Sequence, residues 1–298
     1  MEYHKPVLLK ESVDGLQVES GGIYVDVTFG GGGHSVEILK RLDSNGRLYA
    51  FDQDQDAQKN ALADERFKLI PANFRFIKRF LRFEGVKKVN GILGDFGVSS
   101  HQFNIAERGF STRFEAKLDM RMDTSVEVDA QKIINEYEEK ELRKIFWEYG
   151  ELKNAAKLAK EIVVKRKQKP INTSGELKET ISHFLPAGKE NKILAQVFQA
   201  IRIEVNEEIE ALKEFLTQTE DLLDPGGRLS LISYHSLEDR LVKRYIRSGL
   251  FEGEPEKDFY GNVSVPFKKI GKMIVPTKEE IKKNNRARSA KLRIAERI

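Results

Sequence analysis

The first hundred residues alternate short apolar runs with segments of helical period. Runs rich in Val, Ile, Phe and Tyr, bounded by Gly, Asn or Asp, are typical of buried strands. We expect strands at residues 22–28, 46–52, 67–71 and 89–95. We expect helices between them at residues 35–42, 54–63 and 76–85. A repeated strand–helix–strand order predicts right-handed crossovers and a parallel sheet.

This pattern changes after about residue 110 and returns near residue 224. The intervening apolar positions recur at helical spacing and predict helices at residues 130–149, 151–167, 174–185 and 191–216. The turn Asp224-Pro225-Gly226-Gly227 then leads into a fifth expected strand. That strand covers 229–233, and it is followed by a helix at 237–248 and two strand-like runs, near Val263 and at 270–275. We therefore expect an α/β domain made of residues 1–110 and 217–298, interrupted by a helical domain at 111–216.

The amino-acid composition excludes several kinds of site. The chain has 298 residues, a formal net charge of +4 and no cysteine. It therefore has no disulfide, no thiolate metal site and no thiol nucleophile. Its five histidines show no i, i+4 pair, so we expect no metal. No run approaches the length of a membrane span, and the amino terminus begins with charged residues, so we expect a cytoplasmic protein.

Four consecutive glycines, residues 30–33, lie between the first expected strand and its helix. Glycines at such a turn let a ligand approach the backbone. The dinucleotide pattern G-x-G-x-x-G would need glycine at position 35 or 36, where Ser35 and Val36 stand, and no P-loop Lys-Ser/Thr follows. A tight turn without a ligand is the alternative interpretation.

Acidic residues follow the same strands. Asp26, Asp52, Asp54 and Asp95 lie at or just beyond the carboxyl ends of three expected strands, where open α/β sheets bind ligands. No Lys or Arg occurs between Asp26 and Lys40. Such a site repels a pyrophosphate and attracts a sulfonium or ammonium group, which favours S-adenosylmethionine. The alternative is that these residues cap helices, which we expect for Asp54.

In this hypothesis, the amino-acid end of S-adenosylmethionine lies against Gly32, Gly33 and His34. Its ribose hydroxyls bond to Asp52, the acidic residue that follows the second strand.

Seven sequence strings, spread from residue 4 to residue 290, closely resemble the bacterial RsmH (MraW) family. They are HKPVLLKE (4–11), TFGGGGHS (28–35), GVSS (97–100), RGFS (108–111), LDMRMD (118–123), ISYHSLEDR (232–240) and RARSA (286–290). That family comprises S-adenosylmethionine-dependent methyltransferases acting on the N4 amine of a decoding-centre cytosine in 16S ribosomal RNA. The resemblance implies a class I methyltransferase fold, a Rossmann-like and mostly parallel sheet with an inserted all-helical domain for substrate recognition.

The resemblance also implies a set of cofactor contacts. By motif position these are Gly32, Gly33, His34, Asp52, Phe74, Asp95 and Gln102. Phe74 follows the third strand, where its ring could stack on adenine. The chain departs from the family pattern at Glu115-Ala116-Lys117, at Tyr234, where Phe is usual, and at Asn285, where Pro is usual.

The missing cysteine bears on the reaction. Methylation at cytosine C5 generally needs a cysteine adduct, whereas an exocyclic amine needs only to be held in line with the methyl group and to donate a hydrogen bond. Four residues are candidates for the acceptor of that bond: Asp95, Ser99, Ser100 and His235. The alternative for His235 is that it caps the following helix.

Two basic concentrations favour an RNA substrate. Residues 282–298 hold seven basic residues against Glu296 alone, and Lys153, Lys157 and Lys160 are expected on one helical face. The candidate RNA contacts are Arg108, Arg121, Lys153, Lys157, Arg286 and Arg288. Solvated charged faces, and for the two loop arginines an ordinary connector, are the alternatives. The expected substrate is 16S rRNA, partly single-stranded, since a paired base must be unstacked before its amine can react.

Two rival functions stay open at this point. A nucleotide-dependent oxidoreductase is disfavoured by the glycine spacing and the acidic residues. A catalytically silent RNA-binding factor with a methyltransferase fold would share every pattern above. The sequence also leaves open whether the substrate is naked RNA or the small ribosomal subunit, and whether the protein is a homodimer.

Overall fold

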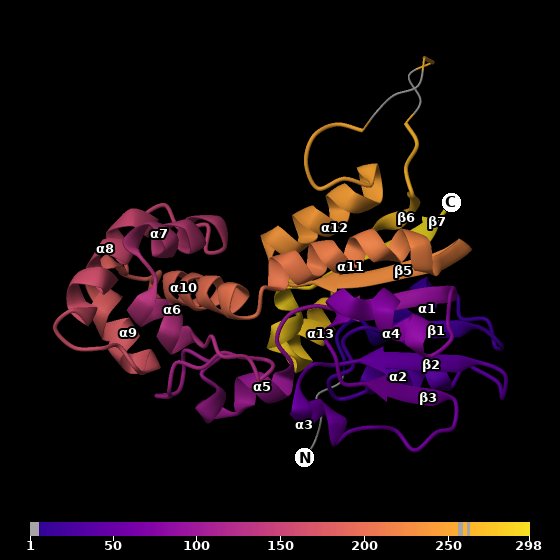
Figure 1. Ribbon diagram of the computed structural model, residues 1–298, viewed down its shortest axis with the longest axis horizontal. Coiled ribbons are helices and arrows are strands. Elements are labelled where there is room, and N and C mark those ends of the chain that lie inside the picture. Colours follow the sequence, from indigo (N-terminus) through magenta and orange to yellow (C-terminus); the bar gives the residue numbers. More distant parts are fainter. Residues whose placement is uncertain (1–5, 256–258, 261–262) are drawn as a thin grey trace. The chain divides into compact units, whose positions relative to one another are not determined.

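The computed structural model describes residues 6–255, 259–260 and 263–298, so His4 and Lys5 of the first motif lie outside it. The chain forms two compact units, Met1–Gly97 with Ile209–Ile298, and Val98–Glu208 (Figure 1). Both divisions fall earlier than the expected 110/111 and 216/217. Phe110 packs in the core of the helical unit, whereas Leu212 and Phe215 pack in the core of the sheet unit. Apolar packing therefore places both boundaries.

The sheet unit contains a seven-stranded sheet in the order β3-β2-β1-β4-β5-β7-β6. The strands are β1 (Ile23–Asp26), β2 (Arg47–Phe51), β3 (Phe67–Ile70), β4 (Val89–Asp95), β5 (Leu223–Ser233), β6 (Phe267–Ile274) and β7 (Lys291–Arg297). Strands β1 to β5 run parallel to one another, and β7 runs antiparallel to both β5 and β6. The expected α/β fold with a mostly parallel sheet is confirmed. Because β1, β2 and β4 are parallel neighbours, their carboxyl ends share one edge.

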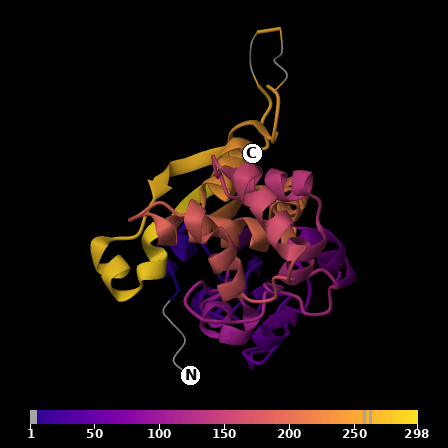
Figure 2. The same cartoon turned by 90° about the vertical axis from the view of Figure 1, so that its left-hand side faces the viewer.

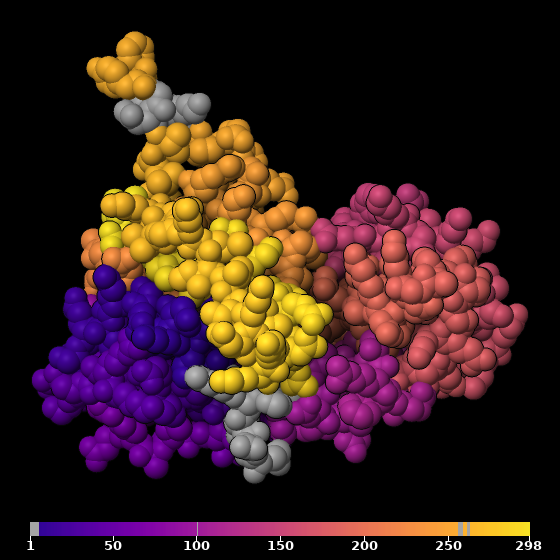
Figure 3. Space-filling view, turned by 180° about the vertical axis from the view of Figure 1, so that it is seen from behind, coloured from indigo at the N-terminus to yellow at the C-terminus, as the bar shows by residue number. Residues whose placement is uncertain are grey.

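The last strand differs from what the charge pattern predicts. The pattern predicts a basic tail over residues 282–298, yet residues 291–297 form β7, which lies between β5 and β6. Leu292 and Ile294 pack with the amino-terminal residues Val7 and Leu8 on one face. Figure 3 shows this carboxyl-terminal segment, in yellow, beside the indigo amino-terminal part of the same unit. Of the two expected strand-like runs, only the second matches a strand, β6; Val263 lies outside it.

Helices cover both faces of the sheet, as a parallel sheet requires. One face packs against α4 (Ile77–Phe83), α11 (Glu208–Leu222) and α12 (Ser236–Ser248), and the other against α1 (Leu9–Gly15) and α2 (Gly33–Leu39). The short elements of this unit are α3 (Gln55–Gln58), η1 (Phe74–Phe76), α13 (Lys278–Lys283) and η4 (Asn285–Ser289). The residues between β1 and α2, and those after β2 and β4, form the loops at the shared edge.

The helical unit, magenta to salmon in Figure 2, has a core of its own. Its elements are α5 (Ser100–Asn104), η2 (Ala106–Arg108), α6 (Ala130–Glu136), α7 (Glu139–Glu148), α8 (Ala155–Arg166), α9 (Ser174–Ile181), η3 (Ser182–Phe184) and α10 (Glu190–Val205). The single helix expected at 130–149 is two helices, divided where Glu138 caps α7. In the described part of the chain, no helix combines the length and the apolar character that crossing a membrane requires.

Candidate functional site

The glycine loop joins β1 to α2 and has the backbone that glycine permits. Gly30 and Gly32 have φ of +52° and +76°, values that other residues rarely adopt. A Cβ on Gly33 would lie 2.1 Å from Cγ of Pro6, so this glycine allows the amino-terminal segment to pack against the loop. Beside Gly30 there is open space. The loop is therefore crowded at Gly33 and open at Gly30.

Asp26, the last residue of β1, is fully buried. Its carboxylate accepts hydrogen bonds from Ser35 Oγ at 2.7 Å and from the backbone N–H of Thr28 at 3.1 Å. Burial raises the pKa of Asp26 to about 6, and these two donors only partly oppose that rise. No Lys or Arg in the described residues forms an ion pair with it. The protein thus keeps an acidic group in its interior without a cation to balance it.

Asp52 follows β2 and faces the glycine loop. Its carboxylate accepts from the backbone N–H of Gly30 at 2.7 Å and from that of Asp54 at 2.9 Å. Burial raises the pKa of Asp52 to about 6, and the charges of Asp54 and Asp26 add to the rise. Asp54 itself caps α3, accepting from the N–H of Asp56 at 3.0 Å, which confirms the expected cap.

Asp95 ends β4, and its side chain is 21% exposed. Its carboxylate accepts a hydrogen bond from Tyr234 Oη at 2.8 Å, and the other oxygen lies 4.0 Å from His34 Nδ1. Burial raises the pKa of Asp95 to about 6; His34 and Tyr234 lower it, and Asp26 raises it further. Asp26 therefore acts electrostatically on both Asp52 and Asp95, and the three carboxyls form one acidic cluster.

His34 is buried at the start of α2, with Nε2 3.2 Å from the carbonyl oxygen of Val7. Burial lowers the pKa of His34, although Asp95 opposes the shift. Burial therefore disfavours the protonated, cationic imidazole. We define the acidic cluster as Asp26, Asp52 and Asp95. None of the three pairs with a Lys or Arg among the described residues, and a cationic ligand would lower the electrostatic energy of the cluster.

Phe74 lies in η1, directly after β3, and is half-buried. Its ring centroid is 5.7 Å from that of Phe96 and 5.5 Å from that of Phe215. These neighbours hold the ring in one orientation at the same edge of the sheet as the acidic cluster. A flat aromatic group such as adenine could stack on its exposed part.

Three of the acceptor and cofactor candidates, Ser99, Ser100 and Gln102, belong to the helical unit. Ser99 caps α5: its Oγ accepts from the N–H of Gln102 at 3.2 Å, and Gln102 Oε1 accepts from the N–H of Ser99 at 3.0 Å. This reciprocal pair gives both side chains a structural role. The side chain of Ser100 lies outside the part of the chain that the structure describes.

His235 caps α12, as its alternative interpretation held. Its Nδ1 accepts from the N–H of Glu238 at 3.4 Å, and Nε2 lies 3.0 Å from Glu238 Oε1. Tyr234, at a position where the family usually has Phe, donates a hydrogen bond to Asp95 and is a site residue that the sequence patterns do not indicate. Its position at the end of β5, beside the end of β4, is the signal that could have identified it.

The two loop arginines hold their own loop. Arg108 donates to the carbonyl oxygens of Arg121 at 2.9 Å and Met122 at 3.2 Å. Arg121 forms a two-pronged ion pair with Asp119, with N–O distances of 2.9 and 2.8 Å. Both guanidinium groups thus have partners within the helical unit, as the connector alternative expected.

The lysine and tail candidates differ in position. Lys157 lies on α8 and is exposed, but Lys153 precedes this helix, so the expected shared helical face does not include it. Arg286 and Arg288 both lie in η4, half-buried and exposed respectively. The rest of the supposed tail is partly neutralised: Lys291 and Arg293 of β7 both pair with Asp239, at 3.2 and 2.8 Å, and Arg297 contacts Glu220.

Comparison with known proteins agrees with this architecture. The model of the MraW methylase family matches residues 1–298. The chain is 71% identical to ribosomal RNA small subunit methyltransferase H of Christiangramia forsetii, over all of this chain and 99% of that one. It is 67% identical to the protein of that name from Flavobacterium johnsoniae, with the same coverage, and 61% identical to that from Cytophaga hutchinsonii, over 99% of each. The chain therefore belongs to the MraW methylase family.

Proposed function

We propose that this protein transfers a methyl group from S-adenosylmethionine to the N4 amine of a decoding-centre cytosine in 16S ribosomal RNA. The observation that carries the proposal is the acidic cluster, three carboxyls with a raised pKa and no Lys or Arg partner in the described residues, at the carboxyl ends of β1, β2 and β4. The names of the relatives, ribosomal RNA small subunit methyltransferases, support the RNA class.

The residues present fit this cofactor. A ligand with a sulfonium and an ammonium group supplies the positive charge that the acidic cluster lacks. Asp52 can accept hydrogen bonds from ribose hydroxyls, and Phe74 offers a ring for the adenine. Open space at Gly30 and the left-handed backbone of the loop leave room for close approach. A dinucleotide would instead bring its phosphates towards three acidic groups, which disfavours an oxidoreductase.

When bound, S-adenosylmethionine supplies a methyl group on a positively charged sulfur, and the amine nitrogen forms its bond to carbon as the carbon–sulfur bond breaks. The protein's part is to hold the amine. Asp95 is the best placed acceptor for the amine N–H, because its side chain is partly exposed and its carboxylate is oriented by Tyr234. His235 is instead engaged with Glu238. The amine loses one proton, which Asp95, with a pKa of about 6, can accept and pass to water.

The helical unit is proposed to recognise the RNA. Lys157 and Lys160 are exposed on α8 and have no ion-pair partner in the described residues. Phosphate contacts of this kind position a nucleic acid without reading its sequence. The proposed partner is the small ribosomal subunit, and the proposed location is therefore the cytoplasm.

The test is methyl transfer to ribosomal RNA from a strain that lacks this gene. Purified protein and S-adenosylmethionine with a labelled methyl group are incubated with small subunits and, separately, with naked 16S RNA. Mass spectrometry of the nucleosides should show N4-methylcytidine in at least one of the two. Label at cytosine C5, or no label in either RNA although the cofactor binds, would contradict the proposal. The second result would favour the silent RNA-binding factor.

A further inference from the structure

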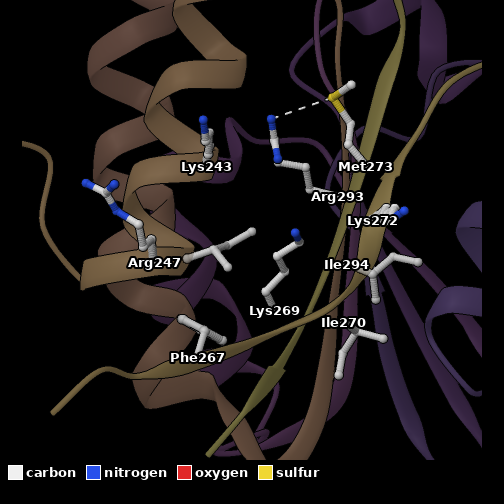
Figure 4. A pocket seen from close by; sticks show the side chains of 10 residues that line it. Lys243, Arg247, Phe267, Lys269, Ile270, Lys272, Met273, Arg293 and Ile294 are labelled. Carbon is white, nitrogen blue, oxygen red and sulfur yellow. Dashed lines mark hydrogen bonds between the residues drawn. The ribbon is translucent and has the colours of Figure 1, made fainter. Parts of the chain in front are cut away.

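A concave site lies in the sheet unit between α12 and strands β6 and β7, apart from the acidic cluster. It is a groove of about 350 Å³, and Figure 4 shows α12 side chains on one side of it and side chains of the two strands on the other. We call it the α12–β6 groove. Among the described residues, none of the side chains that line it is acidic. None of them belongs to the acidic cluster or to the other candidates named above, so the groove is a separate feature.

Four exposed cations line the groove. Lys243 and Arg247 come from α12, and Lys269 and Lys272 come from β6. In the described ranges, none of the four has an ion-pair or hydrogen-bond partner. Arg293 of β7 also lines the groove, but it is paired with Asp239. The fold thus neutralises one cation and leaves four to attract an anionic ligand.

The rest of the lining is apolar. Phe267 and Ile246 are buried, with 2% and 4% of their surface exposed, and Met273 is 39% exposed. Met273 Sδ lies 3.6 Å from Arg293 Nη2, which fixes one wall (Figure 4). Cations around an apolar surface suit a ligand that combines negative charge with flat apolar groups, as single-stranded nucleic acid does.

A simpler explanation accounts for only two of the four exposed cations. β6 is an edge strand, and lysines on an edge strand prevent pairing with other chains. That accounts for Lys269 and Lys272. It does not account for Lys243 and Arg247, which belong to a helix and line the same groove from the opposite side. The convergence of cations from two elements points to a ligand.

The direction of α12 connects the groove with the acidic cluster. The helix begins at Ser236, directly after Tyr234 and His235, and Tyr234 contacts Asp95. At about 1.5 Å per residue, Lys243 and Arg247 lie roughly 10 and 17 Å further along the helix axis. A single-stranded nucleic acid lying along α12 could therefore occupy the groove while another of its nucleotides reaches Asp95.

We propose that the α12–β6 groove binds a single-stranded segment of the substrate RNA that flanks the target cytosine. The lysines and Arg247 contact its phosphates, and a base packs on the apolar wall. This inference rests on the proposed function, and it names the part of the sheet unit that grips the RNA. An acidic peptide is the rival occupant, and competition by polyglutamate distinguishes it from RNA in the test.

The test is the double variant Lys243→Gln/Lys269→Gln, with Arg79→Gln/Lys87→Gln as its matched control. All four side chains are exposed, and the control pair lies on α4 and the loop after it, without a partner in the described part of the chain. Both double variants lose the same charge. Equal melting temperatures for the two variants and the wild type establish that each is folded.

Two readouts are compared. With a labelled oligouridine of about 20 nucleotides, the groove variant should show a plot of log affinity against log salt that is shallower by about 1.4, at roughly 0.7 per lost contact with a single strand. With small subunits, its KM for methylation should rise about tenfold, whereas kcat and the affinity for S-adenosylmethionine stay unchanged. The control variant should match the wild type in both.

Three results would overturn the inference: a groove variant that matches the wild type, a control variant with equal losses, or displacement of oligouridine from the groove by polyglutamate but not by small subunits. These failures are distinct from failure of the proposed function. If the wild type methylates small subunits and the groove variant does so with unchanged KM, only the groove proposal fails. If the wild type methylates nothing but the groove variant loses oligouridine binding, only the proposed function fails.

Discussion

Asp26 and Asp239 belong to the same unit and are almost equally buried, with 0% and 8% of their surface exposed. Their pKa values are nevertheless shifted from the ordinary value in opposite directions. Burial raises the pKa of Asp26 to about 6. Burial also acts to raise the pKa of Asp239, but hydrogen bonds and charges from Arg293 and Lys291 outweigh it, so that the pKa falls. The difference is the presence of cations supplied by β7.

This comparison separates two uses of a buried carboxylate. At Asp239 the charge pair is complete within the protein and joins α12 to β7. The acidic cluster is incomplete: its members accept hydrogen bonds from backbone and hydroxyl groups, but none of them pairs with a Lys or Arg in the part of the chain that the structure describes. Ionised groups held in this way cost folding stability and gain interaction energy when a cationic ligand binds.

The largest expected effect is on turnover. Asp95→Asn should lower the rate of methyl transfer to small subunits by about 100-fold or more, because the amine loses its charged acceptor. Asp239→Asn, which alters a paired carboxylate, should leave the rate at saturating substrate nearly unchanged. Single-turnover kinetics measures both. Equal rate losses would remove the distinction between the two kinds of carboxylate.

Asp52→Ala should weaken the binding of S-adenosylmethionine by about 1.5–3 kcal/mol through the loss of charge-assisted hydrogen bonds to the ribose. The matched control is Asp64→Ala, since Asp64 is paired with Arg66, which holds its pKa at about 2. Titration calorimetry should show unchanged affinity for the control. Wild-type affinity in Asp52→Ala would place the cofactor elsewhere.

Removing the paired and the unpaired carboxylate should change folding stability in opposite directions. Asp239→Ala leaves Arg293 and Lys291 without their partner and should lower the free energy of unfolding by about 2 kcal/mol. Asp26→Asn should raise it at pH 8 without ligand, because a carboxyl whose folded pKa of about 6 exceeds its ordinary value destabilises the fold when ionised. Urea unfolding at pH 8 compares them. Destabilisation by both would show that Asp26 is a structural residue.

The smallest expected effect concerns Tyr234. Tyr234→Phe removes the hydroxyl that donates to Asp95, so the pKa of Asp95 should rise and the acid limb of the pH–rate profile should move to higher pH. A rate loss of a few-fold near pH 7 is expected. Tyr137→Phe, which removes a hydroxyl–carboxylate bond of 3.1 Å to Glu204 in the helical unit, should leave the profile in place.

Local patterns predicted the half of the molecule in which neighbouring segments also pair in space. The strands β1 to β4 and the acidic residues at their ends could be placed because parallel βαβ units follow the chain order. The end of α10 could not be predicted in this way. Asn206, just beyond it, accepts from the N–H of Met122 at 2.7 Å and donates to the carbonyl oxygen of Met120 at 2.8 Å, and both partners are distant in sequence. A helix end that is fixed by distant partners leaves no signal in the neighbouring sequence.

Strand β7 and the site details were missed for a related reason. A segment with three basic residues resembles a solvated tail until Asp239 and Glu220, from other elements, are seen to pair with all three. The contact between Tyr234 and Asp95 likewise depends on the pairing of β4 with β5, across the inserted helical unit. The sequence could indicate which residues are acidic, but only the fold shows which of them are paired.

The most direct test of the unpaired acidic cluster is the affinity for S-adenosylmethionine and S-adenosylhomocysteine measured by calorimetry between pH 5 and 8. The carboxyls of Asp26, Asp52 and Asp95 have a pKa of about 6, so they become ionised as the pH rises through this range. We predict that affinity for the cationic sulfonium compound rises steeply through about pH 6, and that affinity for the uncharged thioether rises much less. Equal pH dependence of the two ligands would contradict the account.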